Sequence, residues 1–537
     1  MLIAHLLLAA VTYISPVKFN VSLAGNFGEP RPNHFHGGVD IKTQKEEGKP
    51  VHAVADGYVC RVTVSQTGYG NAVFVRHPDG HTSVYGHLQR FAPAIEAKVK
   101  KWQYAHHRWD ADVTFHATDV PVSKGQVIAL SGNTGNSFGP HIHLEVRETD
   151  SWAMFDPLEF IPSLVSDRKA PEAHAFMAYP MPGKGVFCGK TEKKKFKPEE
   201  LDSIRLEAWG EVGFAVNADD YMENSSNYYG VRHTVLYVDD KEVFRSDVNG
   251  IPSNHHRLVN SWGDYDEYIK NKRWFMKSFI EPGNRLPILH ADDRQGVVLF
   301  DQERDYHIRY VLTDYYGNAA TYRFVVHGRR MNIPERKLES GDFLLGHGME
   351  KYEFGGFKMT VPAGALADDV VLHPVDSANT YSRTYRLQRK SLPLIVPATV
   401  SVKLDKQVAD VSKLFIAADG RYVGGDYQNG WVDAPVSDIG QKLTIGYDDI
   451  PPIIERVNDD RPAVIILEVK DAETGIASVD ASVDGQFVLF APVGRSSRYI
   501  CQLKNTPVKP SGKSRTLHFI ALDKRGNQRV YQANIKY

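Results

Sequence analysis

A histidine and an aspartate in the segment NHFHGGVDI have side chains that could bind a metal ion. His36 comes four residues before Asp40, with two glycines between them. Glycine lets the backbone turn tightly, so both side chains can converge on one point. Further along, the segment GPHIHLEV begins at a Gly-Pro turn and continues as an apolar segment of strand type. Side chains alternate between the two faces of a strand, so His141 and His143 share one face and the apolar residues take the other.

Three of these side chains match the ligand set of a catalytic zinc ion. His36 and His143 offer imidazole nitrogens, and Asp40 offers a carboxylate oxygen. Catalytic zinc takes three protein ligands and leaves its fourth tetrahedral position to water. The ion favours deprotonation of that water near neutral pH and polarises a carbonyl group. We therefore predict a Zn²⁺ site at His36, Asp40 and His143 that activates water for hydrolysis.

His87 and His141 are not needed as ligands if the other three residues bind the ion. His87 lies in the segment VYGHL, at the end of a predicted strand, and His141 lies one pleat from His143. Either imidazole could hydrogen-bond the attacking water, the developing oxyanion or the leaving amine. The chain lacks an HExxH motif, so the glutamate base of helix-borne zinc peptidases is absent. We predict that His87 and His141 do the work of that base.

Each motif by itself also fits an ordinary hydrogen-bonded histidine, because the chain has 22 histidines. The occurrence of three motifs in order, each at a strand or a turn, favours a site instead. HFHGGVD, VYGHL and SGNTGNSFGPHIHLEVR resemble the signature motifs of the M23 family of zinc metallopeptidases, the LytM/lysostaphin-type cell-wall endopeptidases. The resemblance extends over residues 20–160.

This resemblance implies an N-terminal LytM-type β-sheet peptidase domain that hydrolyses peptide crosslinks of peptidoglycan. It also implies that His36, Asp40 and His143 bind zinc. The same resemblance assigns His87 and His141 to catalysis. All five positions are retained, whereas degenerate members of the family have lost ligands and act only as activators. The alternative is a catalytically blocked LytM-type regulator, or an envelope scaffold protein with an intact metal site.

The composition limits the class of protein. The chain has 537 residues, too many for one hydrophobic core, and roughly three or four domains are expected. Its net charge is −1 and no strongly basic block stands out, which argues against nucleic acid as a partner. The cysteines, Cys60, Cys188 and Cys501, are far apart, so we predict neither a cysteine zinc site nor a disulfide framework. We predict no transmembrane helix.

Short β-type segments separated by turns make up residues 15–165, and we predict one mainly β peptidase domain there. The stretch AIEAKVKKWQY has helical spacing instead. We interpret residues 92–120 as an insertion that packs beside the sheet and forms a wall or a cover of the substrate groove. Its histidines, His106, His107 and His116, fit either surface positions or an inhibitory ligand.

Two distant segments of the chain match each other. Each has a Gly followed nine positions later by an Asp, in VLYVDDKEVF and ASVDGQFVLF, and each then reaches a D-x-x-G-N turn, DYYGN or DKRGN. The turn requires Gly-Asn because its backbone visits positive φ. We therefore predict Ig-like β-sandwich units at residues 166–334 and 451–537. Residues 335–450 are predicted to form a third, different β-rich module.

The first residues, 1–14, contain a short apolar run that resembles the central part of a signal peptide and is too short to span a bilayer. We therefore predict an exported protein, periplasmic or associated with the cell envelope. The expected partners are the stem or crosslink peptides of peptidoglycan. The β-rich units offer surfaces for an envelope protein partner.

Overall fold

The computed structural model describes residues 11–537 except for 202, 224 and 459–462. Most of the expected signal-peptide segment, residues 1–14, therefore lies outside the described residues. The described chain is built mainly from β-strands with short helices between them, which confirms the predicted mainly β fold class. Within the described ranges, every helix is too short or too polar to span a bilayer.

The N-terminal unit contains one large sheet with the strand order β1-β4-β13-β8-β7-β6-β10, with β11 paired to β6 and β14 paired to β13. Its strands are β1 (Leu23–Gly25), β4 (Val39–Lys42), β13 (His141–Glu148), β8 (His81–Gly86), β7 (Ala72–Arg76), β6 (Gly57–Val64), β10 (Ala111–Thr114), β11 (Pro121–Val122) and β14 (Met154–Phe155). The smaller sheet and a hairpin comprise β5 (Pro50–His52), β12 (Val127–Ser131), β9 (Leu88–Phe91), β2 (Pro30–Arg31) and β3 (His34–Phe35). The helices are α1 (Pro93–His106) and α2 (Pro157–Phe160).

Strand β13 separates an apolar face from a polar face, as its alternating sequence predicts. Ile142 and Leu144 are fully buried in the hydrophobic core of the N-terminal unit. His141, His143 and Glu145 alternate with them and therefore point to the opposite side of the sheet. The strand thus anchors itself in the core with one face and presents titratable side chains with the other.

The insertion at residues 92–120 contains a helix and an unexpected strand. Helix α1 covers the stretch that was predicted to be helical, and it buries Ile95 and Val99 in the core of the N-terminal unit. Strand β10 pairs with β6 and so extends the edge of the large sheet. The polar side chains that alternate on β10, in ADVT, concealed this strand in the sequence.

The second unit contains an 11-stranded sheet that follows the order β16-β15-β17-β25-β24-β19-β20-β22. The strands are β16 (Lys194–Phe196), β15 (Glu172–Phe187), β17 (Leu206–Tyr221), β25 (Ala319–Gly328), β24 (Asp305–Thr313), β19 (His233–Val238), β20 (Lys241–Asp247), β22 (Leu289–Ala291), β18 (Tyr228–Tyr229), β21 (Met276–Lys277) and β23 (Val298–Phe300). The helices are α3 (Val259–Trp262) and α4 (Tyr265–Asn271). Strand β17 pairs with β25 only at its start and with β15 along most of its length, so it joins the two parts of the sheet.

The third unit has two five-stranded sheets and a short strand pair. Its strands are β26 (Phe343–Leu345), β29 (Val370–Leu372), β27 (Glu350–Phe354), β28 (Phe357–Val361), β32 (Pro393–Lys403), β36 (Trp431–Asp438), β35 (Asp426–Gln428), β30 (Val375–Ala378), β31 (Arg383–Arg386), β37 (Leu443–Tyr447), β33 (Leu414–Ala418) and β34 (Arg421–Gly424). Its sheets enclose a hydrophobic core of their own.

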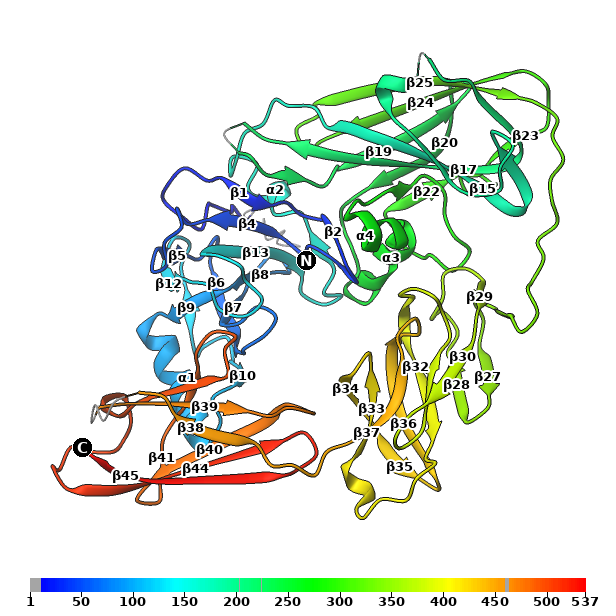
Figure 1. Ribbon diagram of the computed structural model, residues 1–537. Coiled ribbons are helices and arrows are strands. Elements are labelled where there is room, and N and C mark those ends of the chain that lie inside the picture. The colour runs from blue at the N-terminus through cyan, green and yellow to red at the C-terminus, as the bar shows by residue number, and fades with distance from the viewer. Residues whose placement is uncertain (1–10, 202, 224, 459–462) are drawn as a thin grey trace, which may run out of the picture.

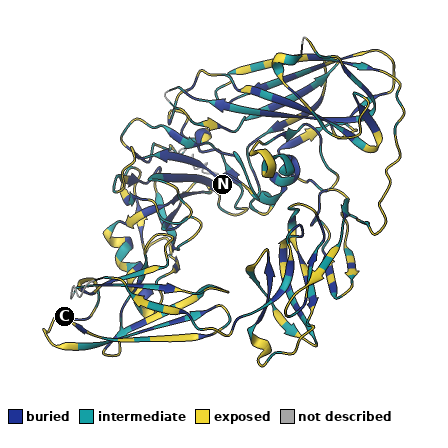
Figure 2. Ribbon diagram, viewed as in Figure 1, coloured by how far each residue is buried: buried dark blue, intermediate teal, exposed yellow. Residues whose placement is uncertain are grey.

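The last unit has two four-stranded sheets around a separate hydrophobic core. Its strands are β38 (Ile453–Arg456), β39 (Val464–Lys470), β43 (Arg498–Gln502), β42 (Ala491–Pro492), β41 (Gln486–Phe487), β40 (Ile476–Val483), β44 (Ser514–Asp523) and β45 (Gln528–Lys536). Figure 2 shows exposed residues along the outer strand β45. The domain boundaries and the Ig-like character of the two predicted repeats remain predictions.

The last unit lies beside the N-terminal unit, although the two are far apart in the sequence (Figure 1). His107, which follows α1, stacks on the ring of Phe487 with 4.5 Å between the ring centroids. Arg495 Nε donates a hydrogen bond of 3.2 Å to the carbonyl oxygen of Gly135. The insertion and the Gly-rich loop before β13 therefore contact the C-terminal unit, a proximity that local sequence patterns cannot predict.

Candidate metal centre

The register of three neighbouring strands brings the predicted ligands together. Strand β13 lies between β4 and β8 in the large sheet. Asp40 on β4 is directly opposite His143 on β13, and Gly86 on β8 is opposite His143 from the other side. Side chains of directly opposed residues lie within reach of each other. The sheet therefore places Asp40 and the residue that follows Gly86, His87, on either side of His143.

The two glycines between His36 and Asp40 let this segment pass close against β13. A Cβ atom on Gly38 would lie 2.0 Å from the carbonyl oxygen of Leu144, which is far inside van der Waals contact. Only glycine permits that approach without moving the strand. His36 can therefore reach the side chains of Asp40 and His143 from the segment just before β4.

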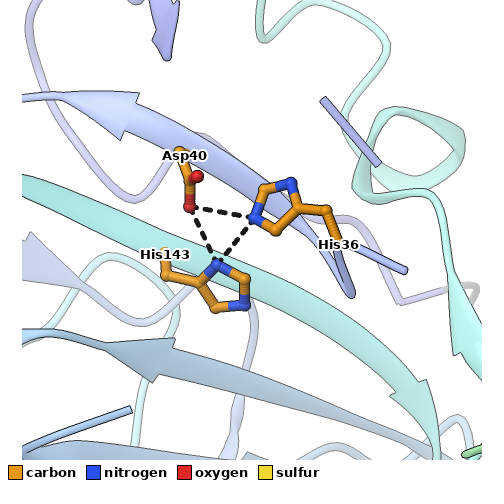
Figure 3. Close-up of side chains that lie close together, drawn as sticks. All are labelled: His36, Asp40 and His143. Carbon is orange, nitrogen blue, oxygen red and sulfur yellow. Dashed lines mark hydrogen bonds and ion pairs between the residues drawn. The ribbon is translucent and has the colours of Figure 1, made fainter. Parts of the chain in front are cut away.

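His36, Asp40 and His143 form a compact set of donor atoms (Figure 3). The Oδ1 atom of Asp40 lies 3.0 Å from His36 Nε2 and 2.9 Å from His143 Nδ1. The two nitrogens are 3.0 Å apart. The three residues have exposed fractions of 2%, 7% and 6%, respectively. They thus form a nearly buried cluster of two imidazole nitrogens and one carboxylate oxygen.

These donors suit zinc. Bonds of about 2.0–2.2 Å in a tetrahedral arrangement place zinc ligands ~3.3 Å from each other, close to the separations of 2.9 and 3.0 Å found here. Nitrogen and carboxylate oxygen are donors that catalytic zinc sites use, with a fourth position kept for water. The residues present therefore fit a zinc ion bound by His36 Nε2, Asp40 Oδ1 and His143 Nδ1.

Each of the three side chains is oriented by a further hydrogen bond. His36 Nδ1 donates to the carbonyl oxygen of Asn26 at 2.6 Å, which leaves Nε2 facing the other donors. Arg31 Nη2 donates to Asp40 Oδ2 at 3.1 Å, which leaves Oδ1 facing the nitrogens. Partners of this kind fix the tautomer and the orientation of metal ligands.

Glu145 has the same orienting role for the third ligand. His143 Nε2 donates to Glu145 Oε1 at 2.8 Å, and the hydroxyl of Tyr69 donates to the same oxygen at 2.7 Å. The guanidinium of Arg147 pairs with the other carboxylate oxygen of Glu145. Glu145 and Arg147 alternate with His143 along β13, so the strand pattern could have identified both residues, but only the fold places Tyr69 beside them.

The pKa values match these contacts. Burial lowers the pKa of His36 to about 4, so this imidazole is neutral at physiological pH. Burial opposes protonation of His143, but hydrogen bonds to Asp40 and Glu145 outweigh it and raise its pKa to about 9. Burial alone would raise the pKa of Asp40, yet the surrounding histidines hold it well below its usual value. The cluster therefore keeps its carboxylate ionised.

His87 and His141 complete a group of five side chains. The rings of His87 and His141 lie 4.7 Å apart, and that of His87 is 5.8 Å from His143. His87 Nδ1 donates to the carbonyl oxygen of Thr134 at 2.8 Å, and His141 Nδ1 donates to that of Gly139 at 2.8 Å. The Nδ1 atoms of both rings are therefore held by backbone carbonyls, and His141 Nε2 lies 3.5 Å from Asp40 Oδ1.

The histidines of the insertion lie elsewhere. His107 stacks on Phe487 of the last unit, and His106 Nδ1 donates to the carbonyl oxygen of Trp102 within α1. His116 is exposed. The surroundings of these three histidines therefore agree better with surface positions than with a role as an inhibitory metal ligand.

Replacing Glu145 by glutamine is expected to weaken zinc binding by about 10–100-fold. The amide keeps the shape of the side chain but removes the negative charge that supports His143 through its Nε2–H. Competition with a fluorescent chelator would measure the affinity. Glu148→Gln, an exposed change at the end of the same strand, is the matched control and should bind zinc as the unchanged protein does. Equal affinities of the two variants would contradict the orienting role.

Known sequences resemble the part of the chain that carries these side chains. Residues 34–104, which include His36, Asp40 and His87, match the sequence model of Peptidase family M23. Residues 343–448 match that of a Zu5-like domain. The DD-carboxypeptidase/endopeptidase Mpg of Neisseria meningitidis serogroup B is 36% identical over 113 residues, which is 21% of this chain and 20% of that protein.

Two further proteins are similar to part of the chain. Peptidoglycan DD-endopeptidase ShyA of Vibrio cholerae is 32% identical over 138 residues, which is 24% of this chain and 26% of that protein. The catalytic domain of the peptidase lysostaphin from Staphylococcus simulans is 26% identical, with a TM-score of 0.20, and the alignment covers 27% of this chain and 92% of that domain. The curated relatives are thus matched over about a fifth to a quarter of their length. The matches to the family model and to the curated relatives confirm the expected resemblance: the N-terminal unit, which holds the candidate metal centre, is similar to the peptidases of family M23.

Proposed function

We propose that the chain is a zinc-dependent endopeptidase that hydrolyses peptide crosslinks of peptidoglycan. The convergence of five side chains from separate strands and loops carries this proposal. His36, Asp40 and His143 provide the three donors of a catalytic zinc site. His87 and His141 provide two imidazoles beside it. Similarity to a peptidoglycan DD-endopeptidase supports the choice of substrate.

Each group in the site then has a distinct part. A zinc ion held by His36, Asp40 and His143 would polarise the peptide carbonyl and acidify water. Burial lowers the pKa of His87 to about 3, so its Nε2 is free to accept a hydrogen bond from the attacking water. His141 Nε2 faces the Asp40 carboxylate and can manage the proton that moves to the leaving amine.

A large cavity beside the metal centre supports a polymeric substrate. The cavity has a volume of about 930 Å³ and lies between residues 28–32 of the N-terminal unit and strand β17 and helix α4 of the second unit. Arg31 lines it and also donates to Asp40. Aromatic and basic side chains of the second unit, such as Trp274 and Lys195, face the same space. We infer that the cavity receives part of the peptide or glycan that flanks the cleaved bond.

Digestion of purified sacculi tests the proposed activity. Zinc-loaded protein is expected to release muropeptides. A chelator is expected to stop the release, because it removes the ion that polarises the peptide carbonyl. Chromatography of the soluble fraction would identify the bond that is cut. A folded, zinc-loaded sample that releases nothing from several types of sacculus would contradict the proposal.

We further propose that the protein is exported and acts in the periplasm or at the cell envelope, where peptidoglycan is found. The resemblance of the N-terminal unit to peptidoglycan enzymes supports this location. The β-rich units after residue 165 are proposed to be Ig-like or related modules that position the substrate or bind another envelope protein. Expressing each unit separately, and checking whether it folds, would test the domain boundaries.

The contacts of the last unit favour a second candidate, a peptidase held in a restrained state. Arg495 Nε donates to the carbonyl oxygen of Gly135, and its guanidinium lies 5.1 Å from the ring centroid of Phe138. These residues belong to the loop whose Thr134 carbonyl orients His87. If this contact restrains the loop, Arg495→Ala would raise the rate of sacculus digestion. An unchanged rate of digestion would show that the Arg495 contact does not restrain the enzyme.

A further inference from the structure

Three aspartates meet where the N-terminal unit joins the second unit. Asp167 comes after α2, Asp220 lies near the end of β17, and Asp314 begins the DYYGN turn after β24. One carboxylate oxygen of each residue lies within 4.8 Å of the others. We call these residues the junction triad.

The junction triad is buried, and its carboxylates form no ion pair with a lysine or arginine among the described residues. The exposed fractions of Asp167, Asp220 and Asp314 are 8%, 2% and 2%. Arg232 lines the same small cavity as the triad, but it forms its ion pairs with other carboxylates. Burial, together with the charges of Asp314 and Asp167, raises the pKa of Asp220 to about 8. Buried carboxylates in one cluster are unfavourable unless a cation or protons compensate them.

Two carboxylate oxygens of the triad have no hydrogen-bond partner among the described residues. Asn318 donates through both its backbone amide and its side chain to Asp314, at 2.8 and 2.6 Å. Asp167 Oδ1 accepts two backbone amides. Asp220 Oδ1 and Asp167 Oδ2 have no partner among the described residues. All three aspartates line a small cavity of about 10 Å³, roughly the space of one water-sized sphere. The unpaired oxygens therefore lie beside a space that an ion could fill.

The last unit repeats this arrangement in a different form. Asp448 precedes that unit, and Asp523 begins its DKRGN turn, as Asp314 begins DYYGN. Together with Asp471 they form a second group of carboxylates within 4.8 Å of one another. Here, however, Asp448 Oδ2 accepts the hydroxyl of Thr474 at 2.6 Å, and Asp471 accepts three backbone amides. The two groups thus have similar positions relative to a D-x-x-G-N turn, but only the junction triad has unpaired oxygens, on Asp167 and Asp220.

We propose that the junction triad binds a Ca²⁺ ion through Asp167, Asp220 and Asp314. Carboxylate oxygens are the ligands that Ca²⁺ prefers, and it accepts irregular geometry and completes its shell with water. Mg²⁺ demands nearly ideal octahedral geometry, which three carboxylates fixed by separate elements do not provide. Glu223, whose carboxylate accepts the backbone amide of Arg168 at 3.1 Å, lies beside the triad and adds to its negative charge.

The ion would fix the second unit against the N-terminal unit. Asp167 belongs to the connection between the units, whereas Asp220 and Asp314 belong to the second unit. Hydrogen bonds already cross this junction, among them one from the hydroxyl of Tyr315 to the carbonyl oxygen of Leu158 at 2.9 Å and one from the hydroxyl of Tyr316 to the carbonyl oxygen of Val165 at 2.7 Å. Binding at the junction triad adds ionic bonds to these and holds in place one wall of the cavity beside the metal centre.

Thermal unfolding of the full chain tests the site. The protein is freed of calcium on a chelating resin, resupplied with one equivalent of ZnCl₂, and titrated with CaCl₂. We expect the unfolding midpoint to rise by about 5 °C at about 10 mM Ca²⁺, as for a site with a Kd of about 10⁻⁴–10⁻³ M. Calorimetry should give one Ca²⁺ per chain, and MgCl₂ should give a smaller rise in the midpoint.

Asp220→Asn separates the proposal from a general effect of the salt. The variant should lose the calcium-dependent rise, yet in calcium-free buffer it should unfold at the same or a higher temperature than the unchanged protein, because an amide needs neither a cation nor a bound proton to be buried beside Asp167 and Asp314. If Asp220→Asn does not accumulate as folded protein, Asp167→Asn is measured in its place. Asp150→Asn, at an exposed turn, is the control and should keep the full rise.

Three results would overturn the proposal. The unchanged protein could show no calcium-dependent rise, or Mg²⁺ could give an equal one. The rise could also persist in Asp220→Asn and disappear in Asp523→Asn, which would place the ion in the last unit. None of these outcomes bears on zinc-dependent cleavage, which is measured separately with sacculi.

Discussion

Replacing Asp40 by alanine is expected to lower peptidoglycan cleavage by about 1000-fold or more and to remove the bound zinc. Asp40 Oδ1 lies 3.0 Å from His36 Nε2 and 2.9 Å from His143 Nδ1, so the change leaves two imidazoles and no charged donor. A catalytic metal supplies several kcal/mol of transition-state stabilisation, and about 1.4 kcal/mol corresponds to a factor of ten in rate. Atomic absorption would measure zinc content, and muropeptide release would measure activity.

A surface aspartate on the same sheet provides the control for Asp40. Asp112 lies on β10, at the edge of the sheet, and pairs with Arg61 in an exposed ion pair. Asp112→Ala should keep both zinc and activity. Circular dichroism of both variants would show whether the fold is retained. An Asp40→Ala variant that remains folded and keeps full activity would rule out the proposed ligand set.

Replacing His141 by alanine is expected to lower the cleavage rate by about 10²–10⁴-fold while zinc stays bound. His141 Nδ1 is held by the carbonyl oxygen of Gly139, so its Nε2 faces the centre, and His141 is not needed as a ligand when His36, Asp40 and His143 bind the ion. The rate loss should appear in kcat, because the imidazole acts on the proton that moves during the reaction. Zinc content and steady-state rates on a crosslinked muropeptide would be measured together.

His87→Ala should behave in the same way, because the His87 ring lies 4.7 Å from that of His141. His116→Ala, an exposed change in the insertion, is the matched control and should be fully active. Loss of zinc from His141→Ala would reassign this residue as a ligand. Unchanged cellular function in a cleavage-deficient His141→Ala strain would instead favour the scaffold alternative over the enzyme.

Part of the site follows directly from local sequence. Alternation along β13 predicts that His141 and His143 share one face, and the structure places the intervening Ile142 in the core. The glycines before Asp40 likewise indicate a close approach of two backbones, which the contact between Gly38 and Leu144 explains. Such features depend only on neighbours in the chain, so a single sequence contains them.

Other parts depend on pairing between distant segments. The strand β10 lies in a polar stretch and forms because β6 offers it an open edge. Tyr69 reaches Glu145 across 76 positions of the chain, and Arg31 finds Asp40 through the hairpin β2–β3. No local periodicity encodes these contacts, because each depends on the register between segments that the sequence does not place side by side.

The sequence by itself determined the mainly β class, the set of five candidate side chains and their chemistry, because residue type and strand alternation are local properties. The tertiary structure decided the rest. It placed Asp40 opposite His143, surrounded the ligands with Arg31, Glu145 and Asn26, brought the last unit back to the first, and gathered the junction triad. Strand register and the docking of separate cores set these positions, and both depend on the whole chain.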